Sequence, residues 1–284
     1  MLSKFDYSRP KNLEGALRIL EEEKGARILA GGTDLMIQLR HNIGDIRHIV
    51  DIKGIPETHR IQYIPKEGLY IGASVTVNQI SRSKDVRNKY LALAQGADNL
   101  ASYQLRNRAT LVGNICNASP GGDLAPPLLV FDGMVEIVGP NGRRMVPLKE
   151  FFTGVKRTIL KSNELVLGVL LPDVSPNDRS TYMKQARLKG HDLATVGVAL
   201  RIDSDRKVYI AMAAVAPTPI RLKELEETIN ARTLDKETVL LAVKEVVRHI
   251  QPISDVRSSA EYRLHVAGVL LKRGLLTLMD KEVG

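Results

Sequence analysis

Two segments of the chain are too rich in glycine and short polar side chains to pack into a hydrophobic core. They are ILAGGTDLM at 28–36 and ATLVGNICNASPGGD at 109–123. Each is expected to begin as a strand and to open into glycine beside a hydroxyl or amide side chain. Glycine lets a ligand approach the backbone, whose N–H groups can then bind anionic oxygens. The two segments therefore constrain the fold to one that holds a ligand against its backbone.

The residues within these segments suit a phosphate-bearing ligand. Gly31–Gly32 and Gly113 leave the backbone uncovered. The neighbouring backbone N–H groups, with Thr33, Thr110 and Asn114, are the expected donors to phosphate oxygens. The pattern is neither the dinucleotide motif GxGxxG nor a P-loop, since no GK[ST] follows. Tight turns explain paired glycines equally well, and that alternative stays open.

Asp123 ends the second segment and has two interpretations. It can accept hydrogen bonds from ribose or ribityl hydroxyls, because the surrounding run lacks basic residues, or it can be a turn or helix-cap residue ahead of Leu124. Pro126–Pro127 predict the start of a helix behind the segment, since proline is tolerated in the first helical turn.

The chain lacks the residue patterns of a self-contained catalytic or metal centre. Cys116 is the single cysteine, which excludes an internal disulfide and a cysteine-built cluster or zinc site. We interpret it as a packing residue. Ser119 has no GxSxG setting, and the six histidines form no HExxH motif. We therefore expect no metal site and expect any chemistry to be that of a cofactor.

The net charge of +9 raises the question of nucleic-acid binding. The basic residues are interleaved with acids, as at 244–249, and no run of four occurs. Tryptophan is absent and aromatic residues are few, so stacking platforms for bases are scarce. We favour a solvated or partner-facing basic surface, or an anionic cofactor, over nucleic acid.

No stretch of 18 apolar residues and no signal peptide is found, so we expect a cytoplasmic protein without a membrane span.

The N-terminal part of the chain predicts alternating helices and strands. Apolar spacing predicts a helix over 12–24, followed by strands at 26–31 and 47–52. A hairpin is predicted at 60–73, and Thr76 with Gln79 is a capping-box signature for a helix through about residue 82. A further helix is predicted over 90–99.

The rest of the chain predicts strands followed by helices. The sequence MVEIVGPNGRRMVPL predicts a hairpin with a type I′ turn at Asn141–Gly142, and 164–172 predicts a buried strand. The linker-like run 173–180 follows. Strands are then predicted up to a stop at Pro217 and Pro219. Helices are predicted over 221–231, 235–250 and 259–277, the last opened by a capping box at Ser258 and Glu261.

Five motifs occur in the order typical of one family: ILAGGTDLMIQLR, RNRATLVGNICNASPGGDLAPPLL, KQARLKGHDLATVGVAL, AVAPTPIRLKELE and SSAEYRLHVAGVLLKRGL. They resemble the FAD-binding medium subunit of the molybdenum hydroxylases, the group of xanthine dehydrogenase, carbon monoxide dehydrogenase and aldehyde oxidoreductase. The resemblance covers nearly the whole chain. It implies an α+β fold: a PCMH-type FAD domain at 1–173, with subdomains at about 1–53 and 54–173, then a smaller domain of antiparallel strands and helices at 178–284.

The resemblance also implies the residues that contact FAD. The first loop is matched in full and receives the pyrophosphate, and the second loop and single positions elsewhere complete the site. The implied set is Ile28, Leu29, Ala30, Gly31, Gly32, Thr33, Asp34 and Leu35; Ala109, Thr110, Gly113, Asn114 and Ile115; and Leu100, Asp123, Val166 and Lys184. The chain departs from the family at Val112, where a second glycine is usual. A β-branched residue does not readily adopt positive φ, so an ordinary backbone is expected there.

In this family the chain would be an electron-transfer subunit. The resemblance implies non-covalent FAD, with molybdopterin and 2Fe-2S clusters on partners: a molybdopterin-binding large subunit and an iron–sulfur small subunit. FAD would then pass electrons to an external acceptor. Two alternatives remain: a self-sufficient PCMH-type flavin oxidase, and a basic scaffold or nucleic-acid-binding protein. The oxidase is disfavoured because neither glycine segment contains a histidine for covalent flavin attachment.

Overall fold

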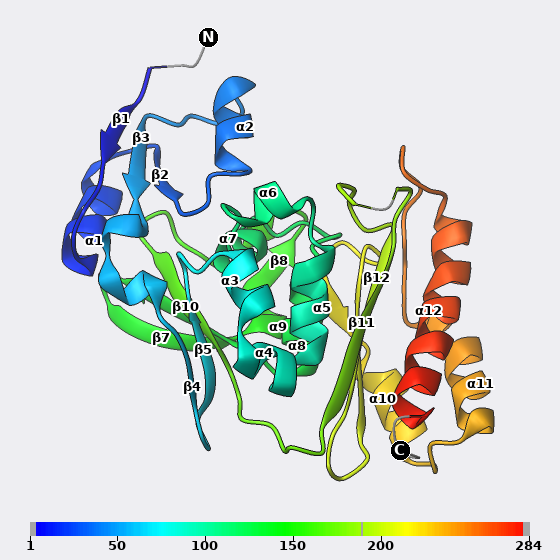
Figure 1. Ribbon diagram of the computed structural model, residues 1–284. Helices are drawn as coiled ribbons and strands as arrows, with labels where there is room; N and C mark the ends of the chain where they lie inside the picture. The colour runs from blue at the N-terminus through cyan, green and yellow to red at the C-terminus, as the bar shows by residue number, and fades with distance from the viewer. Residues whose placement is uncertain (1–3, 189, 281–284) are drawn as a thin grey trace.

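The computed structural model describes residues 4–188 and 190–280. Residues 1–3, 189 and 281–284 lie outside the described part. They include the start of the first expected domain and the end of the second. The described chain forms three units in a row (Figure 1). A small parallel sheet is followed by a five-stranded antiparallel sheet with helices, and then by a four-stranded antiparallel sheet with helices. The predicted α+β fold class is confirmed.

The N-terminal unit is a parallel sheet in the order β1–β3–β2. Helix α1 begins where predicted, because the Asn12 side chain accepts a hydrogen bond from the backbone N–H of Gly15 at 2.9 Å. Its apolar face is buried at Ala16 and Leu20. The elements are β1 (Asp6–Ser8), α1 (Leu13–Glu22), β2 (Ala26–Leu29), α2 (Leu35–Arg40) and β3 (His48–Asp51), followed by the 3₁₀ turns η1 (Ile52–Gly54) and η2 (Pro56–His59).

The middle unit is built on an antiparallel sheet in the order β4–β5–β10–β6–β7. The predicted buried strand becomes β10 at its centre, and Thr76 and Gln79 form the predicted capping box at the start of α3. The strands are β4 (Ile61–Ile64), β5 (Gly68–Gly72), β6 (Met134–Gly139), β7 (Gly142–Pro147), β8 (Phe152–Gly154), β9 (Arg157–Thr158) and β10 (Leu165–Leu171). The helices are α3 (Val77–Arg82), α4 (Lys84–Lys89), α5 (Leu91–Asn99), α6 (Tyr103–Arg106), α7 (Leu111–Cys116), α8 (Ala125–Val130) and α9 (Leu148–Phe151).

The β6–β7 hairpin forms where predicted, but the prediction of a type I′ turn is wrong. That turn needs positive φ at both central residues. Of the pair Asn141–Gly142 only Gly142 has positive φ, at +94°, and Gly142 already pairs with Gly139 across the hairpin. The connecting residues are Pro140 and Asn141, and the proline ring fixes its own φ at about −65°. The loop is therefore closed by a single left-handed glycine.

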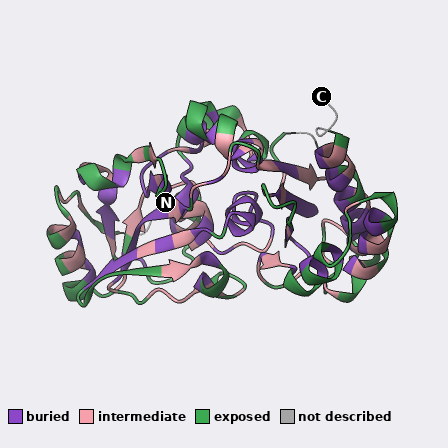
Figure 2. Ribbon diagram, turned by 90° about the horizontal axis from the view of Figure 1, so that it is seen from below, coloured by how far each residue is buried: buried purple, intermediate pink, exposed green. Residues whose placement is uncertain are grey.

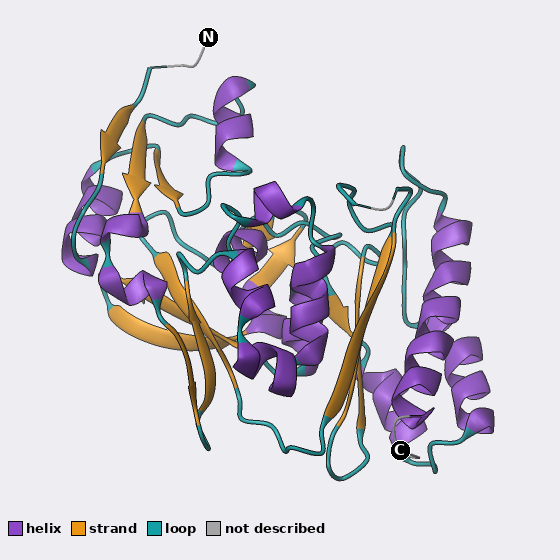
Figure 3. Cartoon of the chain, in the orientation of Figure 1, coloured by secondary structure: helices purple, strands orange, loops and turns teal. Residues whose placement is uncertain are grey.

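The C-terminal unit is an antiparallel sheet in the order β11–β12–β13–β14. One face packs against α5 and α8 of the middle unit, and α10 and α12 cover the other face (Figures 1 and 3). The elements are β11 (Arg179–Gln185), β12 (Val196–Ile202), β13 (Val208–Ala213), β14 (Ile220–Arg221), α10 (Lys223–Asn230), α11 (Lys236–Glu245), the 3₁₀ turn η3 (Val246–Arg248) and α12 (Ala260–Asp280).

Three details of this unit differ from the prediction. Pro217 and Pro219 do not end the sheet, because the chain reverses after β13, where Ala214 has φ +62°, and returns as β14. The helix predicted over 235–250 ends at Glu245 and continues as a 3₁₀ turn. The cap of α12 is Ser259 rather than Ser258, since the Ser259 hydroxyl accepts from the backbone N–H of Tyr262 at 3.2 Å.

The layers share buried cores. One cluster joins the five-stranded sheet and its helices to the near face of the C-terminal sheet, and reaches Tyr182 and Ala211. A second cluster, with Leu200 and Leu271, lies between that sheet and its own helices. Figure 2 shows the buried residues concentrated in the sheets and the helices between them. The Gln95 side chain of α5 reinforces this junction by accepting from the backbone N–H of Tyr182 at 2.6 Å.

Candidate cofactor site

The first glycine segment connects β2 to α2 at the carboxyl edge of the parallel sheet. Residues 28–29 end the strand, 30–34 form a loop, and Leu35 begins the helix. Gly32 has φ +78°, the left-handed region that favours glycine. Residues 28–33 are half-buried, so the loop lies at a surface that a ligand can reach.

The second glycine segment is not a strand, contrary to prediction. Thr110 forms only an isolated bridge with Thr76, and residues 111–116 are helix α7. The Thr110 hydroxyl caps this helix by accepting from the Gly113 N–H at 3.0 Å, so that N–H is not available to a phosphate as expected. Val112 lies within the helix, which confirms the expectation of an ordinary backbone at that position.

The two glycine segments touch through their backbones. A Cβ atom on Gly31 would lie 2.2 Å from the Arg108 carbonyl oxygen and 3.0 Å from the Cα of Ala109, so this approach requires glycine. Nearby, Asn117 Nδ2 donates a hydrogen bond to Asp34 Oδ1 at 3.0 Å. The fold thus brings residues 28–35 and 108–117 together at one place.

Asn114 carries an acceptor that the described chain leaves unsatisfied. Its Oδ1 atom is buried and has no hydrogen-bond partner among the described residues. A Cβ atom on Gly122 would lie 3.2 Å from this oxygen, so the amide faces the turn at 119–122. Buried polar atoms are nearly always paired. The unpaired oxygen therefore suits a hydroxyl donor on a ligand, such as the ribityl or ribose hydroxyls of FAD.

Asp123 joins the middle unit to the C-terminal sheet. Its Oδ1 accepts from the Tyr182 hydroxyl at 2.8 Å and its Oδ2 from Lys184 Nζ at 2.9 Å. Lys184 Nζ also donates to the carbonyls of Asn99 at 3.1 Å and Asp192 at 2.8 Å. Burial raises the pKa of Asp123, while Lys184 and Tyr182 act to lower it. The helix-cap interpretation of Asp123 is wrong, since no side chain caps α8, and the basic partner absent from its own run comes from β11.

The remaining predicted positions lie in the core. Leu100 ends α5 and Val166 lies in the central strand β10, and both are buried. Ile115 is buried in α7. Burial raises the pKa of the Cys116 thiol to about 12, so the thiolate is not available at neutral pH, in agreement with a packing role.

Comparison with known proteins decides what the chain is. Residues 3–174 match the model of the FAD binding domain in molybdopterin dehydrogenase, and residues 181–278 match that of the carbon monoxide dehydrogenase flavoprotein C-terminal domain. The chain belongs to the FAD-binding medium subunits of the molybdenum hydroxylase family. The family inferred from the five sequence motifs is confirmed, and the chain is a subunit type found in oxidoreductases.

Relatives match this medium subunit over almost its whole length. It is 34% identical to the xanthine dehydrogenase FAD-binding subunit of Escherichia coli O157:H7, over 94% of this chain and 93% of that one. It is 31% identical to the carbon monoxide dehydrogenase medium chain of Hydrogenophaga pseudoflava, over 96% of each. A solved structure of carbon monoxide dehydrogenase from Hydrogenophaga pseudoflava has a chain that matches with a TM-score of 0.93 at 30% identity, over 99% of each chain.

Residues outside the motifs also support the glycine segments of this medium subunit. Lys53 Nζ donates to the carbonyl of Ala30 at 3.0 Å and pairs with the buried Asp51 at 2.7 Å. Lys156 Nζ, from the tip of the β8–β9 hairpin, donates to Asn117 Oδ1 at 2.8 Å. These lysines are not predictable from the sequence, because neither lies in a glycine-rich run and only the fold brings them to the loops.

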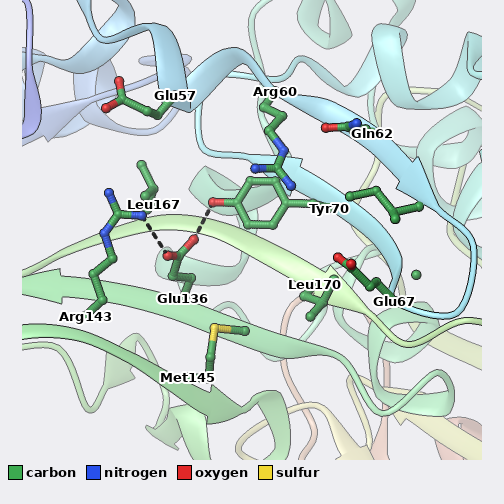
Figure 4. A pocket seen from close by; sticks show the side chains of 12 residues that line it. Glu57, Arg60, Gln62, Glu67, Tyr70, Glu136, Arg143, Met145, Leu167 and Leu170 are labelled. Carbon is green, nitrogen blue, oxygen red and sulfur yellow. Dashed lines mark hydrogen bonds and ion pairs between the residues drawn. The ribbon is translucent and has the colours of Figure 1, made fainter.

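A cavity of about 310 Å³ lies on the face of the five-stranded sheet that points away from the core (Figure 4). Tyr70 and Glu136 line it, whereas the neighbouring residues of their strands point into the core. The Tyr70 hydroxyl donates to Glu136 at 2.6 Å, and Arg60 lies over the Tyr70 ring at 4.7 Å. No residue of the predicted FAD set lines this cavity, so it is separate from the candidate site.

In the described part of this medium subunit, no helix is both long and apolar enough to cross a membrane.

Proposed function

We propose that this chain binds FAD non-covalently where its two glycine segments meet, and carries electrons from the 2Fe-2S clusters of a partner subunit to an external acceptor. The observation that carries the proposal is the backbone contact at Gly31, which brings the two glycine segments together, with the unpaired, buried Oδ1 of Asn114 on the second segment. The half-buried loop held by this contact offers backbone N–H groups to a pyrophosphate, and Asn114 offers an acceptor to a sugar hydroxyl. When bound, FAD supplies the redox chemistry, and the protein supplies binding and orientation.

The roles of the individual residues follow from their places. The loop 30–34 offers backbone N–H groups to the pyrophosphate, and Asn114 accepts from a hydroxyl. Leu100 and Val166, which are buried in the core, are proposed to form the apolar backing of the site. Asp123 and Lys184 already bind each other, so their part in the site is to hold the middle unit and the C-terminal sheet together as well as to face the cofactor.

The partners proposed for the chain are an iron–sulfur small subunit and a molybdopterin-binding large subunit, on which substrate is hydroxylated. The names of the relatives support this, since they are medium or FAD-binding subunits. The division into a FAD domain at 1–173 and a C-terminal domain at 178–284 is part of the proposal, and it agrees with a segment without helix or strand at 172–178.

We expect denaturation of the FAD-loaded protein to release all of its flavin as free FAD. Neither glycine segment contains a histidine, and burial raises the pKa of the Cys116 thiol to about 12, so neither segment offers a reactive nucleophile for attachment at neutral pH. Acid precipitation followed by chromatography of the supernatant measures the released flavin. Flavin left on the precipitated chain, or FMN in place of FAD, would contradict the proposal.

We expect Gly32→Ala to weaken FAD binding more than about tenfold, and Gly44→Ala to change it by less than about twofold. Both glycines have nearly the same φ, +78° and +80°, so alanine introduces the same backbone strain of about 1–2 kcal/mol at each. A Cβ on Gly32 would in addition lie 2.8 Å from Leu29 Cδ1, within the predicted loop, whereas Gly44 has open space around its Cβ position and lies outside that loop. FAD titration of both variants measures the difference. Equal affinities would remove the first loop from the site.

The purified single chain should not hydroxylate purines, aldehydes or carbon monoxide. It has one cysteine and therefore cannot ligate an iron–sulfur cluster with its own cysteines, and the substrate site is proposed to lie on the large subunit. Steady-state assays with an artificial electron acceptor, with and without the two partner subunits, test this. Substrate-dependent turnover by the chain with FAD alone would instead favour the self-sufficient oxidase.

A further inference from the structure

Arg263 is a buried cation, and the sequence motifs assign no role to its charge. It lies in the first turn of α12 and is 3% exposed. Its guanidinium donates through Nη1 to the carbonyls of Ala214 at 3.0 Å and Thr195 at 3.3 Å, and through Nη2 to Asp255 at 2.7 Å. Its Nε is buried without a partner among the described residues. Burial of a charge is costly unless it is paired and hydrogen-bonded, so Arg263 depends on Asp255 and on these two carbonyls staying in place.

The two carbonyls bound by Arg263 belong to the part of the C-terminal unit that contacts the second glycine segment. Ala214 donates its N–H to the Pro120 carbonyl at 2.7 Å, and it has φ +62°, a strained conformation for alanine. The carbonyl oxygen of Ala194, next to Thr195, would lie 3.2 Å from a Cβ on Gly121. Arg263 thus fixes the backbone at Ala214 and Thr195. The same stretches of backbone contact residues 120–121.

Residues 120–121 lie between two residues of the proposed FAD site, Asn114 and Asp123. Gly122, the next residue, faces the unpaired Oδ1 of Asn114. A shift of this turn moves the surface that the cofactor would meet. We propose that Arg263 is a positioning residue for FAD: by fixing the Ala214 and Thr195 carbonyls it sets the place of the 117–123 turn and hence FAD affinity. This inference rests on the proposed function.

The chain offers a matched control for a buried arginine in Arg221. It lies in β14 of the same sheet and is also buried, with its side chain 9% exposed. It pairs with Glu226 at 2.6 Å and donates to the Leu129 carbonyl at 3.2 Å. Its partners lie outside 117–123. Loss of either guanidinium should lower the thermal stability of the protein, but only loss of Arg263 should change the cofactor site.

The test is FAD titration of the deflavinated full-length chain, at a temperature at which circular dichroism shows every variant folded. We expect Arg263→Met to raise the Kd for FAD at least about tenfold, and Arg221→Met to leave it within about twofold. Arg263→Lys should recover part of the loss, because an ammonium can still donate to one carbonyl. The visible circular dichroism of the bound flavin should change in the Arg263 variants only.

Each outcome decides the inference. Wild-type Kd in Arg263→Met, or equal weakening in Arg221→Met, overturns it while the proposed function stands. Failure of the wild-type chain to bind FAD overturns the proposed function and this inference with it. If Arg263→Met does not fold, Arg263→Lys decides by hydrogen exchange: faster exchange of the Ala214 N–H and raised Kd support the inference, and wild-type values of both overturn it.

Discussion

Replacing Gly31 with alanine should abolish measurable FAD binding by the full-length chain. The new Cβ atom would lie 2.2 Å from the Arg108 carbonyl oxygen, a backbone atom that cannot rotate away. One of the two glycine segments must then move, and the contact that forms the candidate site opens. We expect the Kd for FAD to rise at least about a hundredfold, equivalent to about 2.7 kcal/mol, as measured by titration of the deflavinated protein.

A control for this experiment must carry a similar clash elsewhere in the N-terminal unit. Gly54 provides it, because a Cβ at that position would lie 2.4 Å from the Pro10 carbonyl oxygen. Gly54→Ala should therefore destabilise the same small sheet to a similar degree, with much weaker loss of FAD binding. If both variants bind FAD equally poorly, the effect of Gly31→Ala is a general loss of folding and the glycine contact has no special role in the site.

Lys184→Met should lower the free energy of unfolding by roughly 3–5 kcal/mol at neutral pH, as expected when one partner of a buried ion pair is removed. The side chains of Asp123 and Lys184 are only 5% and 6% exposed, so Asp123 would be left as a buried carboxylate without its cationic partner. Adding Asp123→Asn to this variant removes the unpaired charge and should restore much of the loss. Denaturant unfolding of Lys184→Met, Asp123→Asn and the double variant measures the coupling free energy between the two side chains.

The pH dependence of this variant has a defined sign. Burial raises the pKa of Asp123 in the folded protein, and removal of Lys184 raises it further. A carboxyl with a raised folded-state pKa binds its proton more tightly when folded, so its contribution is most favourable at low pH and is lost as pH rises through the folded-state pKa. The deficit of Lys184→Met relative to wild type should therefore shrink as the pH falls below neutral. A deficit independent of pH would show that the loss comes from packing alone.

The local signals in the sequence predicted most of the regular elements. Helix α1 begins at Asn12 and α3 at the capping box of Thr76, because a cap acts through residues three positions apart and is visible in the sequence. The pair Asn141–Gly142 wrongly predicts a type I′ turn, because Pro140 precedes it and the two-residue loop is Pro140–Asn141. The strand predicted at the start of the second glycine segment is wrong, because Thr110 caps a helix there.

The candidate site was predictable in its loops but not in its supports. The glycine segments are recognisable because their composition is unusual over a short stretch. Asp123 and Lys184 are 61 positions apart, and Arg263 is farther still from the turn it supports. Pairings of this kind depend on how the C-terminal sheet packs on α5 and α8, and no local pattern encodes that packing. Lys53 and Lys156 were missed for the same reason.

The position of the C-terminal sheet between two layers of helices has a consequence for inheritance. Its near face shares one hydrophobic core with the middle unit, and a largely buried ion pair crosses the boundary. A gene fusion that joined this N-terminal part to a different C-terminal part would need a matching cation, a matching hydroxyl at the Tyr182 position and a complementary apolar face at once. Substitutions on one side of this boundary are therefore expected to require compensating substitutions on the other.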